Sequence, residues 1–165
     1  MKIKKISKLI IFFLVGIIET ACVHHETFLE YKTLPPQGWN KDSVLTFQVN
    51  ITDTSSLYNV YINIRNRGEY PYQNLWLFLN IQPPHSTLPI KDTIECYLAD
   101  IHGKWLGSGV GNVFEMPVLY KQNECFKQSG TYLFQIIQGM RNDVLPGISN
   151  IGLKVEKISS PKKHN

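Results

Sequence analysis

The feature that most constrains the fold of this chain is the alternation of apolar and polar residues along short segments. In residues 59–65 apolar residues occupy every second position, and residues 45–51 repeat the pattern. Successive side chains of a β-strand point to opposite faces, so this period of two predicts strands with one buried face. Residues 75–79 are apolar at every position, which is typical of a strand buried on both faces or of a short buried helix, and the short length favours the strand.

About eight such segments follow one another with turn residues between them. The other predicted strands cover residues 94–98, 112–116, 132–137 and 151–155, and one helical turn is expected within residues 122–128. No long stretch has the 3.6-residue period of a helix. The sequence therefore predicts an all-β fold with little helix, an antiparallel β-sandwich of two sheets of jelly-roll or immunoglobulin-like type.

A positively charged start and a short apolar run open the chain. Lysines precede the apolar residues 9–18, a run shorter than the about 20 residues that span a bilayer, and this arrangement is typical of a secretory signal. The run ends at Ala21-Cys22, which resembles the box where bacterial lipoproteins are lipidated, although Glu19 departs from that box. Lipidation of Cys22 is the favoured interpretation, and an ordinary secretory signal with a chance cysteine is the alternative.

The chain divides into four expected parts. After the signal, a polar stretch with two adjacent prolines predicts a tether, because proline disfavours regular structure. The parts are the lipoprotein signal peptide 1–21, the lipidated tether 22–41, the β-sandwich domain 42–158 and a disordered tail 159–165.

Charge argues against nucleic acid as a partner. The whole chain has a net charge of +4. Residues 1–21 hold four lysines and Glu19, so the mature chain is left at +1. Nucleic-acid binding requires a clustered basic surface, and the sequence predicts none.

No motif predicts catalysis or a metal site. The segment Gly107–Gly111 has neither the following helix of a dinucleotide-binding turn nor the spacing of a nucleophile elbow, so it is interpreted as a glycine-rich crossing or bulge. His85 and His102 lie in predicted loops, and a histidine pair beside Cys22 lacks further ligands. We expect no enzyme activity, no cofactor and no metal.

Two cysteines remain once Cys22 is modified. Cys96 and Cys125 would both be exported, and an oxidising compartment permits a disulfide between them. Cys96 also alternates in phase with the apolar Ile94 and Leu98, and a free buried cysteine behaves as a small apolar residue. The sequence leaves both interpretations open.

Three groups of residues resemble the gliding motility lipoprotein family GldH of Bacteroidetes bacteria. They cover most of the mature chain in the order of that family: Tyr58-Asn59, Ile64-Arg65-Asn66, Tyr70-Pro71 and Asn74-Leu75-Trp76-Leu77; Gly103-Lys104-Trp105-Leu106-Gly107-Ser108-Gly109-Val110-Gly111; Gly130-Thr131-Tyr132-Leu133-Phe134, Gln138-Gly139-Met140-Arg141, Leu145-Pro146-Gly147-Ile148 and Ile151-Gly152. The resemblance implies an envelope-anchored accessory of gliding or of its associated protein secretion. It implies no catalytic residues.

The expected partners are other envelope proteins of that machinery and, through the lipid, the membrane. We expect the outer membrane as the location, and its periplasmic face because no acidic surface-export run follows Cys22. Tyrosine, tryptophan and arginine are common at binding hot spots, and the candidate partner-binding residues are Arg65, Arg67, Tyr70, Tyr72, Trp105 and Arg141.

Two alternatives to that partner-binding hypothesis stay open. In the first, the loop that follows residue 65 is purely structural, with Arg65 paired to Glu69 and Tyr70 packed down. In the second, the protein is a carbohydrate-binding sandwich, for which Tyr61, Tyr70, Tyr72 and Trp105 are the candidate aromatic contacts. A row of exposed aromatics on one sheet face or loop rim would favour the second.

Overall fold

The computed structural model describes residues 26–158. Within this range every regular element is a strand. The strands are β1 (Glu26–Thr33), β2 (Trp39–Asn40), β3 (Leu45–Ile51), β4 (Leu57–Arg67), β5 (Asn74–Gln82), β6 (Ile90–Tyr97), β7 (Ser108–Val110), β8 (Val113–Glu124), β9 (Gly130–Gln138), β10 (Val144–Leu145) and β11 (Ile148–Ile158).

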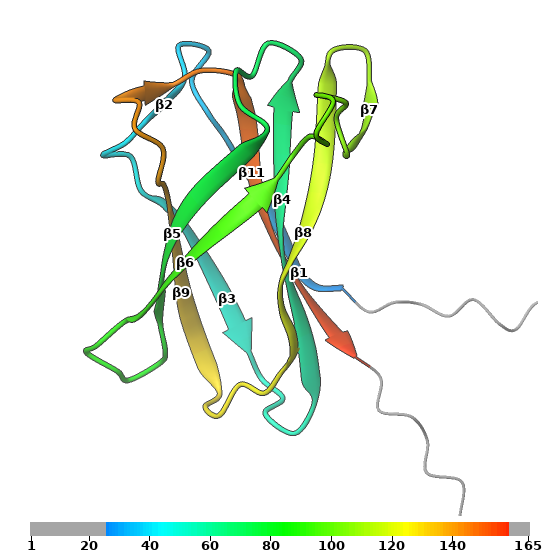
Figure 1. Cartoon of the computed structure of the whole chain (residues 1–165). Coiled ribbons are helices and arrows are strands. Elements are labelled where there is room, and N and C mark those ends of the chain that lie inside the picture. Colours follow the sequence, from blue (N-terminus) through cyan, green and yellow to red (C-terminus); the bar gives the residue numbers. More distant parts are fainter. Residues whose placement is uncertain (1–25, 159–165) are drawn as a thin grey trace, which may run out of the picture.

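Two antiparallel sheets face each other (Figure 1). One has the order β1-β11-β4-β8-β7 and the other the order β3-β9-β5-β6, while β10 and β2 form a small additional pair. The predicted all-β antiparallel sandwich is confirmed. The expected helical turn within residues 122–128 is wrong, because β8 continues to Glu124 and Phe126 then turns into the core between Tyr58 and Tyr132.

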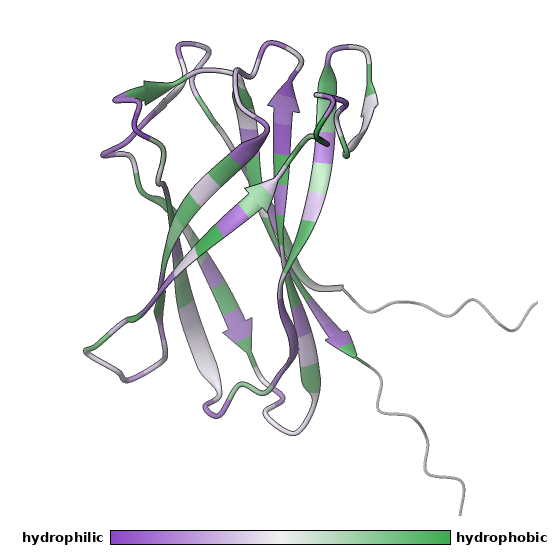
Figure 2. Cartoon of the chain, in the orientation of Figure 1, coloured by the Kyte–Doolittle hydropathy of each residue, from purple (hydrophilic) through white to green (hydrophobic). Residues whose placement is uncertain are grey.

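Alternation along the strands builds the core, as β3 and β4 illustrate. Phe47, Val49 and Ile51 are fully buried, whereas Gln48 and Asn50 between them are exposed. Figure 2 shows the resulting alternation of apolar and polar bands along the strands. The prediction of half-buried strands over residues 45–51 and 59–65 is confirmed.

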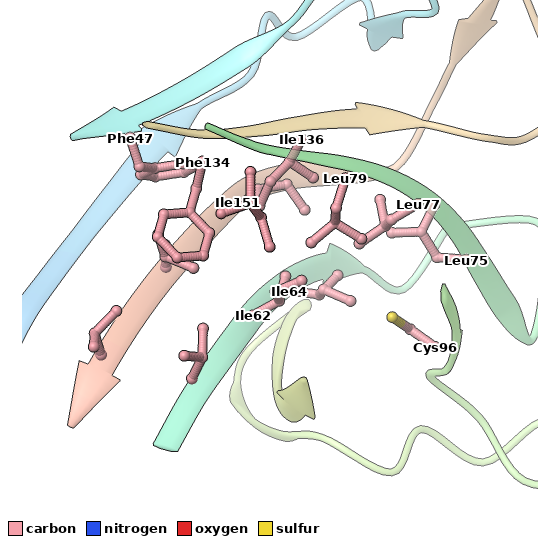
Figure 3. Packing of buried hydrophobic residues seen from close by; sticks show 14 of the residues in the cluster. Phe47, Ile62, Ile64, Leu75, Leu77, Leu79, Cys96, Phe134, Ile136 and Ile151 are labelled. Atoms are coloured by element: carbon pink, nitrogen blue, oxygen red, sulfur yellow. The ribbon is translucent and has the colours of Figure 1, made fainter. Parts of the chain in front are cut away.

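The core lies between the two sheets. Figure 3 shows aliphatic and aromatic side chains from both sheets meeting there, with the Cys96 thiol among them. Burial raises the pKa of Cys96 to about 12, which keeps this thiol protonated at neutral pH. Cys96 and Cys125 are both free, and Cys125 is exposed. The disulfide that the sequence left open is therefore not formed in this structure.

The folded domain begins earlier than the sequence suggested. Residues 26–33, assigned to the tether, form β1 and pair with β11 along its length. Tyr31 lies on the outer face of the sheet against Gly152, where an added Cβ would be 2.6 Å from the Tyr31 ring. Glu30 and Lys32 form an ion pair of 2.5 Å. In β1 an aromatic residue therefore faces outward while charged residues occupy the alternate positions, the opposite of the usual pattern of a half-buried strand. This is why the sequence did not predict the strand.

Candidate binding face on the four-stranded sheet

Strand β5 has one buried face and one exposed aromatic face. Leu75, Leu77 and Leu79 are at most 1% exposed, but Trp76 is 39% and Phe78 is 47% exposed. The prediction that residues 75–79 are buried on both faces is therefore wrong. No further layer covers the outer side of this sheet within residues 26–158.

Four exposed aromatic residues gather on this side, and we call them the aromatic face: Tyr72, Trp76, Phe78 and Tyr97. In the sheet register Trp76 pairs with Glu95, and Tyr97 pairs with Asn74. Directly paired residues of neighbouring antiparallel strands project to the same side, so β6 places Tyr97 on the side that carries Trp76. Tyr72 precedes β5 and completes the set.

A shallow hollow of about 480 Å³ lies on the aromatic face. Its lining residues come from the start of β5 and the turn after β9: Tyr72, Asn74, Trp76, Phe78, Gly139, Met140 and Arg141. The Gly139 amide donates to the Trp76 carbonyl at 2.7 Å. A Cβ on Gly139 would lie 3.2 Å from both Phe78 and Trp76, so glycine leaves room for the hollow.

Hydrogen bonds hold the polar rim of this face in place. Asn74 Nδ2 donates to Glu95 Oε1 at 2.5 Å, and the Tyr97 hydroxyl donates to Glu95 Oε2 at 3.1 Å. The Glu95 carboxylate raises the pKa of Tyr97. The Tyr72 hydroxyl donates to Asn142 Oδ1 at 2.7 Å. The aromatic side chains are thus presented on a sheet with a fixed rim.

Arg141 supplies positive charge at the edge of the hollow. Its side chain is exposed, and it forms no ion pair with the rest of residues 26–158. Of the six predicted partner-binding residues, Arg141 and Tyr72 are the two that line this hollow.

Tyr70 and Trp105 support the neighbouring loops. Their rings lie 6.4 Å apart, and Trp105 lies 5.9 Å from the Phe114 ring. Tyr70 is 4% exposed, its hydroxyl donates to the Asn74 carbonyl, and burial raises its pKa. Tyr70 therefore packs its loop down onto the sandwich, while Tyr72, 5.7 Å from the Tyr70 ring, stays at the surface.

Arg65 and Arg67 belong to the opposite sheet. Arg65 Nε is 2.6 Å from Glu115 Oε2, and its guanidinium lies 4.1 Å from the centre of the Tyr31 ring. The Tyr31 hydroxyl donates to the other Glu115 oxygen at 2.5 Å. The expected pair of Arg65 with Glu69 is replaced by this cross-strand pair, and Glu69 lies 4.0 Å from Arg67 instead. The structure thus separates these two arginines from the aromatic face.

Sequence reasoning missed Trp76, Phe78 and Tyr97. The available signal was the pair of aromatics at every second position of residues 75–79, in phase with Asn74 and Asn80. Tyr97 likewise alternates with the buried Cys96 and Leu98. Because aromatic residues are usually buried, this alternation indicates a face of β5 but does not by itself tell whether that face is covered.

Within residues 26–158, histidines, cysteines and acidic residues form no group of three or more that could hold a metal ion. The same part of the chain contains no helix long and apolar enough to cross a membrane. His85 and His102 are both exposed, in separate loops.

The fold and the face define a two-sheet β-sandwich domain that presents an aromatic surface. The sequence model of the GldH lipoprotein family matches residues 26–155. The chain therefore belongs to the GldH lipoprotein family, a family of gliding motility lipoproteins and not an enzyme family. The predicted resemblance is confirmed, and the protein is a membrane-anchored lipoprotein of the cell envelope.

Two curated relatives agree along nearly their whole length. A gliding motility lipoprotein GldH homolog of Christiangramia forsetii is 36% identical over 89% of this chain and 93% of the relative. The gliding motility lipoprotein GldH of Flavobacterium johnsoniae is 32% identical over 89% of this chain and 94% of the relative. Among solved structures, the VP2 subviral particle of infectious bursal disease virus has a TM-score of 0.37 at 13% identity, over 81% of this chain and 30% of that one.

Proposed function

We propose that this protein is a non-enzymatic accessory or scaffold of the gliding motility machinery or of its associated protein secretion, acting through protein–protein contacts. Cys22 is its lipid anchor, and the periplasmic face of the outer membrane is its location. The N-terminal signal ending in Ala21-Cys22 supports the anchor, which lies outside the described residues. The absence of an acidic run after Cys22 supports the periplasmic side.

The aromatic face is the observation that carries the proposal. Large aromatic side chains with an arginine nearby are the residue types that dominate binding energy at protein interfaces. Here backbone hydrogen bonds hold the strand segment that carries Trp76 and Phe78 on both sides, so little loop ordering is needed when a partner binds. Arg141 at the edge favours a partner that places a carboxylate beside its apolar contact.

The test compares pull-downs from cross-linked envelopes of the native bacterium. A double variant, Trp76→Ser with Phe78→Ser, should keep its membrane location and folded circular dichroism and lose the envelope partner. The matched control is Leu119→Ser, because Leu119 is 44% exposed on β8 of the other sheet. Equal recovery of the same partner by the wild type, the double variant and the control would mean that the aromatic face does not bind this partner.

The aromatic face also supports the carbohydrate-binding alternative. Exposed Trp76, Phe78 and Tyr97 form the kind of aromatic row on one sheet face that this alternative requires. However, the Tyr97 hydroxyl and the Asn74 amide already contact Glu95, and the Tyr72 hydroxyl contacts Asn142. These rim groups are already hydrogen-bonded to one another, and this favours a protein partner over a sugar. Glycan-array binding that Trp76→Ala abolishes and Trp105→Ala preserves would establish the carbohydrate function instead.

A further inference from the structure

The position of β1 limits how far the domain can stand from its membrane. Cys22 precedes the first residue of β1, Glu26, by four residues. Four residues of fully extended chain span at most about 14 Å. If Cys22 carries the acyl chains, as the proposed function holds, Glu26 lies within about that distance of the bilayer surface.

β1 begins near one particular end of the sandwich. Glu26 pairs with Glu156, close to the end of β11 at Ile158, and Ile158 pairs with Leu57 at the start of β4. The loops 52–56, 83–89 and 125–129 lie at this end, which is the lower end in Figure 1. Through Glu156, Glu26 lies level with Asn59 of β4, so eight residue steps, about 26 Å, separate it from the opposite end of β4 at Arg67. Because β1 begins nearer the lower end than the upper end, the short connection favours an orientation with the lower end toward the membrane.

Exposed apolar residues lie at this same end. Leu88, in the loop between β5 and β6, is 78% exposed, and Ile90 at the start of β6 is 58% exposed. Ser86 fixes the loop, because its hydroxyl donates to the Leu88 carbonyl at 3.0 Å and accepts from the Leu88 amide at 3.3 Å. Ile90 also lines an apolar hollow of about 400 Å³ that includes Phe126 of the adjacent loop.

Two exposed lysines lie near these residues, beside the Asp92 and Glu124 carboxylates. Lys91 follows Ile90, and Lys127 lies in the 125–129 loop; both side chains are exposed. Neither forms an ion pair with another residue of the 26–158 range. Lysines beside exposed apolar residues attract anionic headgroups while the apolar groups enter the interface.

We propose that the lower end of the sandwich docks on the bilayer that holds the lipid anchor, with Leu88 and Ile90 entering the interface. This rests on the proposed lipidation of Cys22. It leaves the opposite end, with the loops around Tyr70 and Trp105, facing away from the membrane. The aromatic face begins near that opposite end, since β5 starts there with Asn74.

The test places an environment-sensitive fluorophore at either end of the lipidated protein. In a Cys125→Ser background, Leu88→Cys and Val110→Cys are labelled separately, and Val110 is the matched control because it is 93% exposed in the β7–β8 hairpin at the other end. The proteins are reconstituted into vesicles that contain brominated lipids. The label at position 88 should shift to shorter wavelength and be quenched, while the label at position 110 should behave as in water.

Flotation of the same vesicles separates the two hypotheses. Protein that floats while position 88 is quenched no more than position 110 would overturn the docking and leave the anchor intact. Protein that does not float and carries no acyl group would overturn the lipidation of Cys22, and the docking proposal with it.

Discussion

Neighbouring residues of β5 should respond to truncation in opposite ways. Leu77 is fully buried between the sheets, whereas Phe78 is 47% exposed on the aromatic face. Leu77→Ala removes buried methyl groups and leaves a cavity, which costs about 2–5 kcal/mol. Phe78→Ala removes a larger side chain, but only about half of it is buried, so roughly 1 kcal/mol of burial is lost.

Urea unfolding of the mature domain measures the difference. With a slope of about 2 kcal/mol per molar urea, the middle of the usual range, Leu77→Ala should lower the unfolding midpoint by roughly 1–2.5 M. Phe78→Ala should lower it by less than half of that amount at an unchanged slope. In pull-downs the relative effect of the two variants should be the opposite: Phe78→Ala should lose the partner while it remains folded, and Leu77→Ala should affect partner recovery less.

Two results would refute this reasoning. A midpoint for Phe78→Ala as low as that for Leu77→Ala would mean that Phe78 is core and that the aromatic face is not a free surface. Partner recovery that follows stability across the two variants would mean that binding depends on the fold as a whole and not on this face.

Three further predictions concern the anchor, the edge of the sandwich and the packing of β1. Cys22→Ser should move the protein from membrane to soluble fractions, and unchanged fractionation together with an unacylated wild type would contradict the anchor. Lys121 holds the pKa of Asp92 below its usual value, so this pair should stabilise the fold at neutral pH and cease to do so as the pH falls below about 4. In thermal melts at different pH values, Asp92→Asn should reduce the fall in melting temperature at acidic pH. An unchanged pH profile in this variant would mean that other groups cause the fall. Gly152→Ala should lower the free energy of unfolding by about 1–3 kcal/mol, because the added methyl group clashes with the Tyr31 ring. Calorimetry should find a smaller loss when Gly152→Ala is made in a Tyr31→Ala background. Equal losses in both backgrounds would exclude the clash.

The strands with polar outer faces were predictable from the sequence. In β3 and in most of β4 the inward-facing positions are apolar and the outer positions are mostly polar, so the period of two locates both the strand and its inner face; the buried Asn63 and Asn66 of β4 are the exceptions. The second central strand predicted over residues 132–137 is likewise found as β9, which lies between β3 and β5.

The sequence located β5 as a strand but not its exposed outer face, and it did not reveal β1 as a strand. β5 carries Trp76 and Phe78 outward, so it looks buried on both sides. β1 carries Tyr31 outward, and its partner β11 is far away in the chain. A local pattern reports how apolar a position is, but not whether another layer covers it. The partner of Arg65 is hidden for the same reason, because Glu115 is a cross-strand neighbour on β8.

The most direct test of a partner-binding role for the aromatic face is site-specific photocrosslinking in living cells. A photoreactive phenylalanine analogue replaces Phe78 in one strain and Leu119, on the outer side of the opposite sheet, in another. A partner-binding aromatic face predicts a defined adduct with an envelope protein from position 78, lost on Trp76→Ser, and no such adduct from position 119. Adducts of equal yield from both positions, or none from position 78 in folded and membrane-bound protein, would contradict it.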